Sequence, residues 1–165
     1  MELFRPQEAT RDEQPMSETP LSDLIADHIA AVTPESFARL LGGFRSSMLG
    51  VIAVGFPAGA GGGYVSTAEQ PISVGLTRHA SGRSMVLAFA DPAAFARRFG
   101  RPFNGEIAGE ALVATVLLNP GCEGVLVNSA LAEVSVTIDR ATCESLARPA
   151  VGSEQPARRP RWRFW

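Results

Sequence analysis

The chain has 165 residues, which fits one domain large enough to bury a core, and its 45% hydrophobic content excludes a wholly disordered protein. No apolar run approaches the ~20 residues that a membrane-spanning helix needs, because glycine, proline or charged residues interrupt each run. The net charge is −2 and is unevenly spread: residues 1–20 are acidic, whereas residues 148–165 carry five arginines and one acidic residue.

The N-terminal segment and the cysteines indicate the cellular compartment of the protein. Residues 1–20 are polar, contain three prolines and lack the apolar core of a secretory signal. We therefore expect a flexible acidic leader on a cytoplasmic protein. Cys122 and Cys143 are too few to frame a disulfide scaffold, and we expect them to stay reduced.

Two helices are predicted after the leader. Ser22 is the expected N-cap of the first, whose apolar face consists of Leu24, Ile25, Ile29 and Val32. Thr33 is the expected N-cap of the second, with Pro34 at its first position and an apolar face of Phe37, Leu40, Leu41 and Phe44. The Gly42-Gly43 pair is expected to weaken the end of this second helix, because glycine is a poor helix former.

Strand signals follow. Residues 48–56 are apolar enough to form one buried strand, and residues 57–63 read as a flexible, glycine-rich connection. Residues 69–77 are predicted as the next strand. Residues 78–82 then turn the chain into a further strand over residues 85–89.

The next segment has the strongest local signals. Asp91 is predicted to cap a helix that starts with Pro92, because its carboxylate can accept hydrogen bonds from the first free amides of that helix. Residues 107–118 end in a run that is apolar on every side, so periodicity does not separate a buried strand from a buried helix. Their length, their alanine content and the Asn-Pro-Gly that follows favour the helix.

Two strands, over residues 125–127 and 135–138, and a last helix capped by Asp139 complete the body of the chain. This mixture predicts a mixed α/β class, with α+β as the alternative, in which helices cover a layered sheet. We expect one domain over residues 21–147, between the leader and a basic aromatic tail at residues 148–165.

Three stretches of this chain resemble the SseB-type family, the N-terminal domain of "enhanced serine sensitivity" proteins. They read PESFARLLGGFRSSMLGVIAV, GRSMVLAFADPAAFARRF and CEGVLVNSALAEVSVTIDRATCESL, and the resemblance covers about residues 21–146. It implies a small bacterial α/β module without established enzymatic activity, whose relatives are associated with binding other proteins. The family has no agreed catalytic residues to carry over. The glycine-rich stretch at 57–63 and the arginine-aromatic tail depart from its pattern.

The sequence offers no catalytic constellation. His28 lies on the first predicted helix and His79 in a turn, and we expect both to be surface residues. Two histidines and two cysteines this widely separated do not make a zinc spacing. The glycines at 59–63 do not form a phosphate loop, because a Walker loop needs a lysine and this chain has none. We therefore expect a protein that is not an enzyme and holds no metal or cofactor.

The cysteines receive different expectations. Cys122 follows a Pro-Gly turn, where a thiol would be exposed, although no neighbouring cation or helix start would activate it. Cys143 falls inside an amphipathic helix and is expected to be a small core residue.

Polar residues at the ends of elements provide one candidate site. Asp91, Asn119 and Asn128 are each explained by a cap, a helix stop or a turn. Asn128 and Ser129 could instead present hydrogen-bonding groups at the carboxyl end of a strand, where α/β folds often bind ligands. This alternative predicts a small-ligand sensor or enzyme accessory protein, with residues 57–63 as a lid.

The tail is the second candidate site. Its residues are Arg158, Arg159, Arg161, Trp162, Arg163, Phe164 and Trp165. Arginine interleaved with aromatic residues suits nucleic acid, an anionic membrane surface or an acidic protein groove. A protein is the favoured partner, because the acidic body would repel nucleic acid. The alternative is a tail that folds back onto its own domain or stays disordered.

The preferred function is a non-catalytic interaction module that binds a partner protein, or a second copy of itself, through helix faces or a sheet edge. Hydrophobic interface candidates, most of them expected to serve the core, are Phe37, Leu41, Phe44, Phe95, Phe99 and Phe103. Arg97, Arg98 and Arg101 lie beside Phe99 and Phe103 and form a second basic-aromatic group.

Overall fold

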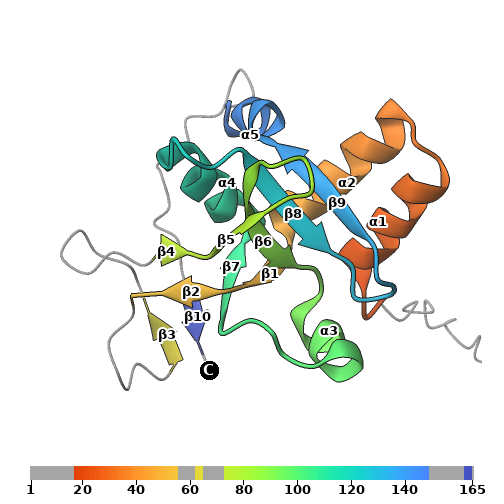
Figure 1. The fold of residues 1–165 in the computed structure, drawn as a ribbon. Helices are drawn as coiled ribbons and strands as arrows, with labels where there is room; N and C mark the ends of the chain where they lie inside the picture. Colours follow the sequence, from red (N-terminus) through yellow and green to blue (C-terminus); the bar gives the residue numbers. More distant parts are fainter. Residues whose placement is uncertain (1–16, 56–61, 65–72, 149–161, 165) are drawn as a thin grey trace, which may run out of the picture.

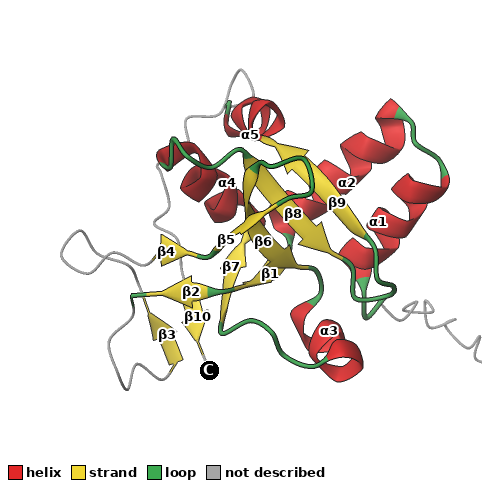
Figure 2. Ribbon diagram, viewed as in Figure 1, coloured by secondary structure: helices red, strands yellow, loops and turns green. Residues whose placement is uncertain are grey.

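The fold is that of a computed structural model, which describes residues 17–55, 62–64, 73–148 and 162–164. The predicted leader up to residue 16 lies outside the described residues, as do positions 57–61 of the glycine-rich connection. Among the described residues the chain forms five helices and ten strands (Figures 1 and 2). The helices are α1 (Pro20–Ala30), α2 (Pro34–Ser46), α3 (Pro92–Phe99), α4 (Gly109–Leu118) and α5 (Arg140–Ala147).

Eight of the strands form one sheet. The strands of the chain are β1 (Met48–Val51), β2 (Ala53–Val54), β3 (Gly62–Tyr64), β4 (Ser73–Val74), β5 (Leu76–Arg78), β6 (Ser84–Phe89), β7 (Gly105–Ala108), β8 (Gly124–Asn128), β9 (Ser135–Asp139) and β10 (Trp162–Phe164). The main sheet has the order β3-β10-β7-β1-β6-β8-β9, with β5 also paired to β6, while β2 and β4 form a separate pair. Strands β6 and β8 run parallel, and the other described pairs are antiparallel. The predicted mixed α/β class is confirmed.

The two faces of the main sheet are covered unequally. One face meets α1, α2, α4 and α5 in the larger core, to which the sheet contributes residues such as Val86, Val125 and Ile138. Because side chains alternate along a strand, Phe89 of β6 faces the other way. There it packs with α3 in a smaller cluster that includes Phe95 and Phe103. Helix α3 accordingly stands apart from α4 and α5 in Figure 1.

The start of α1 differs from the prediction. The helix begins at Pro20 with Thr19 at the N-cap position, so Ser22 is not the cap. Ser22 is fully buried inside the first turn, and its hydroxyl accepts a hydrogen bond of 2.8 Å from the amide of Ala130. The predicted apolar face is also shorter, because Ile29 is 46% exposed and Val32 lies beyond the helix end.

Helix α2 follows its local signals more closely. Thr33 is the N-cap, and Thr33 and Ser36 form a reciprocal capping box. The helix continues past Gly42-Gly43 to Ser46. Leu24 of α1 packs so closely against Gly43 that a Cβ there would collide with it. The glycine therefore allows α1 and α2 to approach each other.

The predicted strand at 48–56 is two strands. β1 ends at Val51 and β2 begins at Ala53, where the chain leaves the main sheet to pair with β4. The side chain of Asn104 bonds to the backbone of Ala53 in both directions, at 2.7 and 2.9 Å. The side chain of Asn104 thus satisfies backbone groups of Ala53 that a neighbouring strand would otherwise satisfy, at the point where β1 gives way to β2. Phe56 lies outside the described residues.

Two other strand predictions need correction. The stretch at 69–77 contains β4 and β5 instead of one strand, and positions 69–72 lie outside the described residues. In the stretch at 107–118 the helix was correct from Gly109 onward, but Ile107 and Ala108 belong to β7. Gly109 is the first residue of α4, and it lies so close to the backbone of Phe44 that a Cβ there would collide with it.

Part of the tail enters the sheet. β10 lies between β3 and β7, with Arg163 opposite Glu106 and Phe164 opposite Gly105. For these three residues the arrangement is the predicted alternative of a tail that folds back. The remaining predicted contact residues, Arg158, Arg159, Arg161 and Trp165, lie outside the described residues.

Candidate functional site

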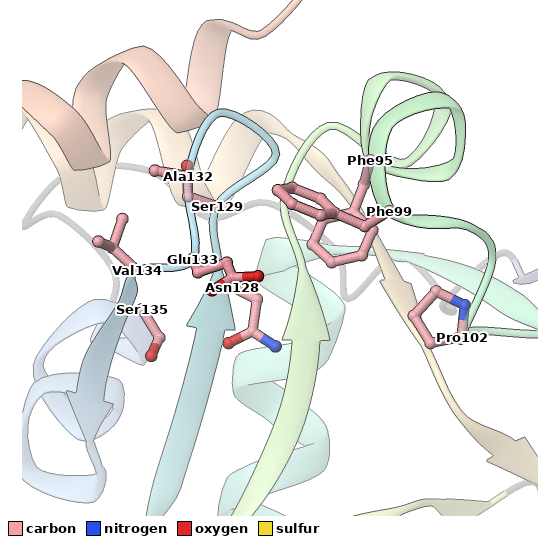
Figure 3. A pocket seen from close by; sticks show the side chains of 9 residues that line it. All are labelled: Phe95, Phe99, Pro102, Asn128, Ser129, Ala132, Glu133, Val134 and Ser135. Carbon is pink, nitrogen blue, oxygen red and sulfur yellow. The ribbon is translucent and has the colours of Figure 1, made fainter.

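A groove opens at the carboxyl ends of the parallel strands β6 and β8 (Figure 3). Its volume is about 390 Å³. It is lined by Phe95, Phe99, Pro102, Asn128, Ser129, Ala132, Glu133, Val134 and Ser135. Both predicted ligand residues, Asn128 and Ser129, therefore lie in this groove.

One wall follows from the way β8 ends. After Asn128 the chain turns over residues 129–134 and returns as β9, and the amide of Ser129 donates to the carbonyl of Val134 at 3.0 Å. The hydroxyl of Ser129 accepts from the amide of Leu131 at 3.1 Å and is almost fully buried. Ser129 thus shapes the turn and has little surface to offer a ligand.

The opposite wall is aromatic and belongs to α3. Phe95 packs edge-on against Phe89 of β6, with 4.9 Å between ring centroids, and Phe99 follows at 5.1 Å from Phe95. Phe95 is 7% exposed and Phe99 is 39% exposed, so Phe99 presents most of the ring surface. Figure 3 shows both rings across the groove from Glu133 and Ser135.

Two arginines of the α3 region lie over aromatic rings. The guanidinium of Arg98 lies 5.3 Å from the ring centroid of Phe99, and that of Arg101 lies 5.4 Å from the ring of Phe103. Arg97 pairs with Glu18, just before α1. Arg98 and Arg101 thus contact the rings of the predicted basic-aromatic group, and its residue Phe99 lines the groove.

Asn128 supplies the polar group at the floor. Its carbonyl accepts from the amide of Ala90 at 2.9 Å, which anchors the strand end. Within the described part of the chain, its side-chain amide makes no hydrogen bond. Figure 3 shows this amide between the ends of β8 and β6. The half-buried amide can therefore donate to and accept from a bound molecule.

The other predicted interface phenylalanines mostly serve the cores, as expected. Phe44, Phe95 and Phe103 are buried, and Phe37 and Leu41 pack at the edge of the larger core. Phe99 differs from them because its ring is substantially exposed.

The histidines occupy structural positions. His28 is half-buried, and its Nδ1 lies 2.8 Å from the hydroxyl of Ser36. Its ring packs 5.2 Å from that of Phe37, so it links α1 to α2. His79 bonds to Ser81 in the turn between β5 and β6. Within the described ranges, no three His, Cys, Asp or Glu side chains gather in a way that could hold a metal ion.

Both cysteines are buried free thiols. The exposure expected for Cys122 was wrong, since it is fully buried and its thiol contacts the carbonyl oxygen of Gly124 at 3.3 Å. Cys143 lies in the core as expected. Burial raises its pKa to about 11, with a smaller contribution from Cys122.

The raised pKa of Cys143 predicts a loss of stability in alkaline solution. The thiol of Cys143 has a higher pKa in the folded chain than in the unfolded chain, so its protonated form stabilises the fold. This stabilisation is complete below the unfolded pKa and disappears as the pH rises through about 11. Between pH 8 and about 10.5, the free energy of unfolding should therefore fall more steeply for the native chain than for Cys143→Ala. Urea unfolding of both proteins at the two pH values measures this, and parallel decreases would contradict it.

Two residues with long-range roles were not found from the sequence. Asp91 was predicted to cap α3, but its carboxylate makes no bond to that helix. It accepts instead from the amides of Leu21 and Ser22 at 3.2 and 2.7 Å, and so caps α1. Its backbone is left-handed, with φ of 47°.

Arg140 is the second such residue. Its guanidinium donates to four carbonyl oxygens, which belong to Val116 (3.1 Å), Leu117 (3.0 Å), Asn119 (3.0 Å) and Cys122 (2.8 Å). It therefore caps the C-terminal end of α4 from the first residue of α5. No local signal indicates this, because an arginine at a helix start ordinarily opposes the helix dipole.

Comparisons with known proteins found no matching family model, curated protein or solved structure. The resemblance to the SseB-type family therefore stays a prediction from the sequence. Of the helices in the described ranges, none combines the length and the apolar character needed to cross a membrane.

Proposed function

We propose that the chain is a cytoplasmic, non-catalytic interaction module of the SseB type, and that the groove between α3 and the 129–134 turn receives an extended segment of a partner protein. The observation that supports this is the exposed ring of Phe99, which borders the groove and carries a guanidinium on its face. Aromatic residues and arginine dominate the energetics of protein interfaces, because they combine a large contact area with directed polar groups.

The charges around the groove indicate the partner's chemistry. Arg98 lies over the ring of Phe99 on the α3 side, whereas Glu133 is the single acidic residue in the lining. A segment with an apolar anchor, flanked by acidic residues on the α3 side, fits this arrangement. Glu133 and the Asn128 amide would then meet backbone amides of the segment.

Replacing Phe99 by alanine tests the proposal. The substitution removes exposed ring surface, and we expect about a tenfold to hundredfold loss of partner affinity, as for an interface anchor. The partner is captured from a native lysate with the full chain, identified, purified and titrated by calorimetry against both proteins. The control is Leu118→Ala, since Leu118 is 84% exposed on α4 and outside the groove lining.

A partner whose purified form binds native chain and Phe99→Ala equally would refute the groove as the docking site. Unchanged binding by Leu118→Ala is required for a loss at Phe99 to be specific.

A small-molecule sensor is the second candidate, and the free amide of Asn128 favours it. Strand carboxyl ends in α/β folds often bind ligands, and a few polar groups in an otherwise apolar pocket fix a ligand's orientation. In this case the chain captures no protein, and its melting temperature rises with one compound of a metabolite panel. Asn128→Leu would abolish that rise.

A further inference from the structure

We propose that β9 is a self-complementary edge, along which a second copy of this chain adds antiparallel and joins two sheets into one. The inference rests on the proposed role as an interaction module, and it names the second copy as a partner along an edge that shares only Ser135 with the groove lining. Strand β9 is the last strand in the order of the main sheet, next to β8 (Figure 1).

The backbone register shows which groups of β9 face outward. Residues paired between β8 and β9 include Val127 with Val136 and Val125 with Ile138. At the two ends of this ladder, the amide of Ser129 donates to Val134 and the amide of Arg140 donates to Glu123. Hydrogen-bonded pairs alternate with non-bonded pairs in an antiparallel ladder. Val136 and Ile138 therefore bond to β8, whereas Ser135, Thr137 and Asp139 turn their backbone groups away from it.

These outward groups are available for pairing. Within the part of the chain that the structure describes, the amides of Ser135, Thr137 and Asp139 and the carbonyls of Ser135 and Thr137 meet no hydrogen-bond partner. The carbonyl of Asp139 lies at the N-cap of α5, where it serves the first turn of the helix. Such a row of free donors and acceptors is a template for another strand.

The sequence of β9 does not protect this edge. Natural edge strands are commonly blunted by proline, by lysine or by a bulge. β9 reads SVTID, with three β-branched residues in succession, no proline, no basic residue, and Asp139 at its end as the one charged residue. Its register with β8 is also continuous, without a bulge. The strand is therefore built to pair on both sides.

The pattern of free groups fits a second copy. In a two-fold pairing centred on Thr137, each Thr137 donates to and accepts from the other. Each Ser135 faces Asp139 of the other copy, whose free amide meets the free carbonyl of Ser135. Val136 of one copy lies opposite Ile138 of the other on the helix-covered face, so the apolar layer continues across the junction. The two Asp139 carboxylates lie at opposite ends of the pairing, so no like charges face each other.

The test uses opposite charges at Thr137. In the two-fold pairing the two Thr137 side chains face each other, so Thr137→Lys or Thr137→Glu alone places like charges opposite each other. We expect the native chain to dimerise in sedimentation analysis at micromolar to submillimolar concentration, and each variant to associate at least about tenfold more weakly. An equimolar mixture of the two variants should recover dimers containing one of each. Thr137 does not bond to β8 and is half-exposed, so circular dichroism should show both variants folded.

Val32→Lys is the control, because Val32 is 79% exposed beyond the end of α1. It should dimerise like the native chain. A native chain that stays monomeric up to about 0.5 mM would overturn the inference, because the dissociation constant of a specific dimer lies well below that concentration. Equal association of Thr137→Lys and the native chain, or a mixture that does not recover, would also overturn it.

The experiment separates this edge from the groove. Phe99→Ala should dimerise normally, and Thr137→Lys should keep its affinity for a partner that binds at the groove. If the native chain dimerises and Phe99→Ala still binds the partner with native affinity, the groove proposal is refuted and the edge proposal stands.

Discussion

Replacing Asp91 by alanine is expected to lower the free energy of unfolding by about 2–4 kcal/mol. The carboxylate satisfies the amides of Leu21 and Ser22 at the start of α1, and alanine leaves both without an acceptor. Alanine is also less tolerant than aspartate of the left-handed backbone at this position, where φ is 47°. Both effects act in the same direction.

Two further variants separate these contributions in urea unfolding. Asp91→Gly relieves the left-handed strain and still loses the cap, so it should cost less than the alanine variant. Asp91→Asn keeps the tolerance for this backbone and one acceptor oxygen, and it should be the mildest of the three at about 1 kcal/mol. If all three were within error of the native chain, the cap would contribute nothing to stability.

Replacing Arg140 by alanine is expected to cost about 2–4 kcal/mol of unfolding free energy. The substitution removes the donors of four carbonyl oxygens at the end of α4 and in the turn after it. The Arg140 side chain is 32% exposed, so water can replace only part of what is lost. Chemical denaturation of the full chain measures this loss.

Lysine at the same position tests the geometry. Its ammonium group has the same charge but cannot reproduce the planar fork of the guanidinium, so Arg140→Lys should recover less than half of the lost stability. The control is Glu144→Gln, which removes only the exposed ion pair at 3.5 Å and should cost less than about 0.5 kcal/mol. Full recovery by lysine would show that charge alone suffices.

The sequence predicted the features whose causes lie within a few residues. Thr33 caps α2 through Ser36, and Asp139 caps α5 through the amide of Thr142, because these partners are three residues apart. The predicted strands at 85–89 and 125–127 were found within β6 and β8 for a similar reason, since their apolar runs are bounded by turn residues.

The errors come from partners that are distant in the chain. Asp91 has the local pattern of a cap for α3, but it bonds to amides about seventy positions earlier. The division of residues 48–56 depends on Asn104, which is 51 positions away from Ala53. No window of sequence contains both partners of such a bond, so periodicity and capping rules do not detect it.

The residues of the candidate groove were predicted in part. Asn128 and Ser129 were identified because polar residues at strand ends often face ligands, and both line the groove. The sequence did not distinguish exposed Phe99 from buried Phe95, because the rotation of α3 against β6 decides which ring faces outward. It also did not show that the hydroxyl of Ser129 is used within its own turn.

The bonds at the start of α1 have a consequence for motion. Two of them join α1 to Asp91, and a third joins the Ser22 hydroxyl to the amide of Ala130 in the 129–134 turn that lines the groove. Fraying of this helix end therefore breaks a contact of the turn as well, so both segments belong to one unit of local opening. Their amides should exchange with solvent at related rates, although they are more than one hundred positions apart in the chain. A molecule that holds the turn in the groove would then also slow the fraying of α1, and binding would be detectable on the far side of the sheet.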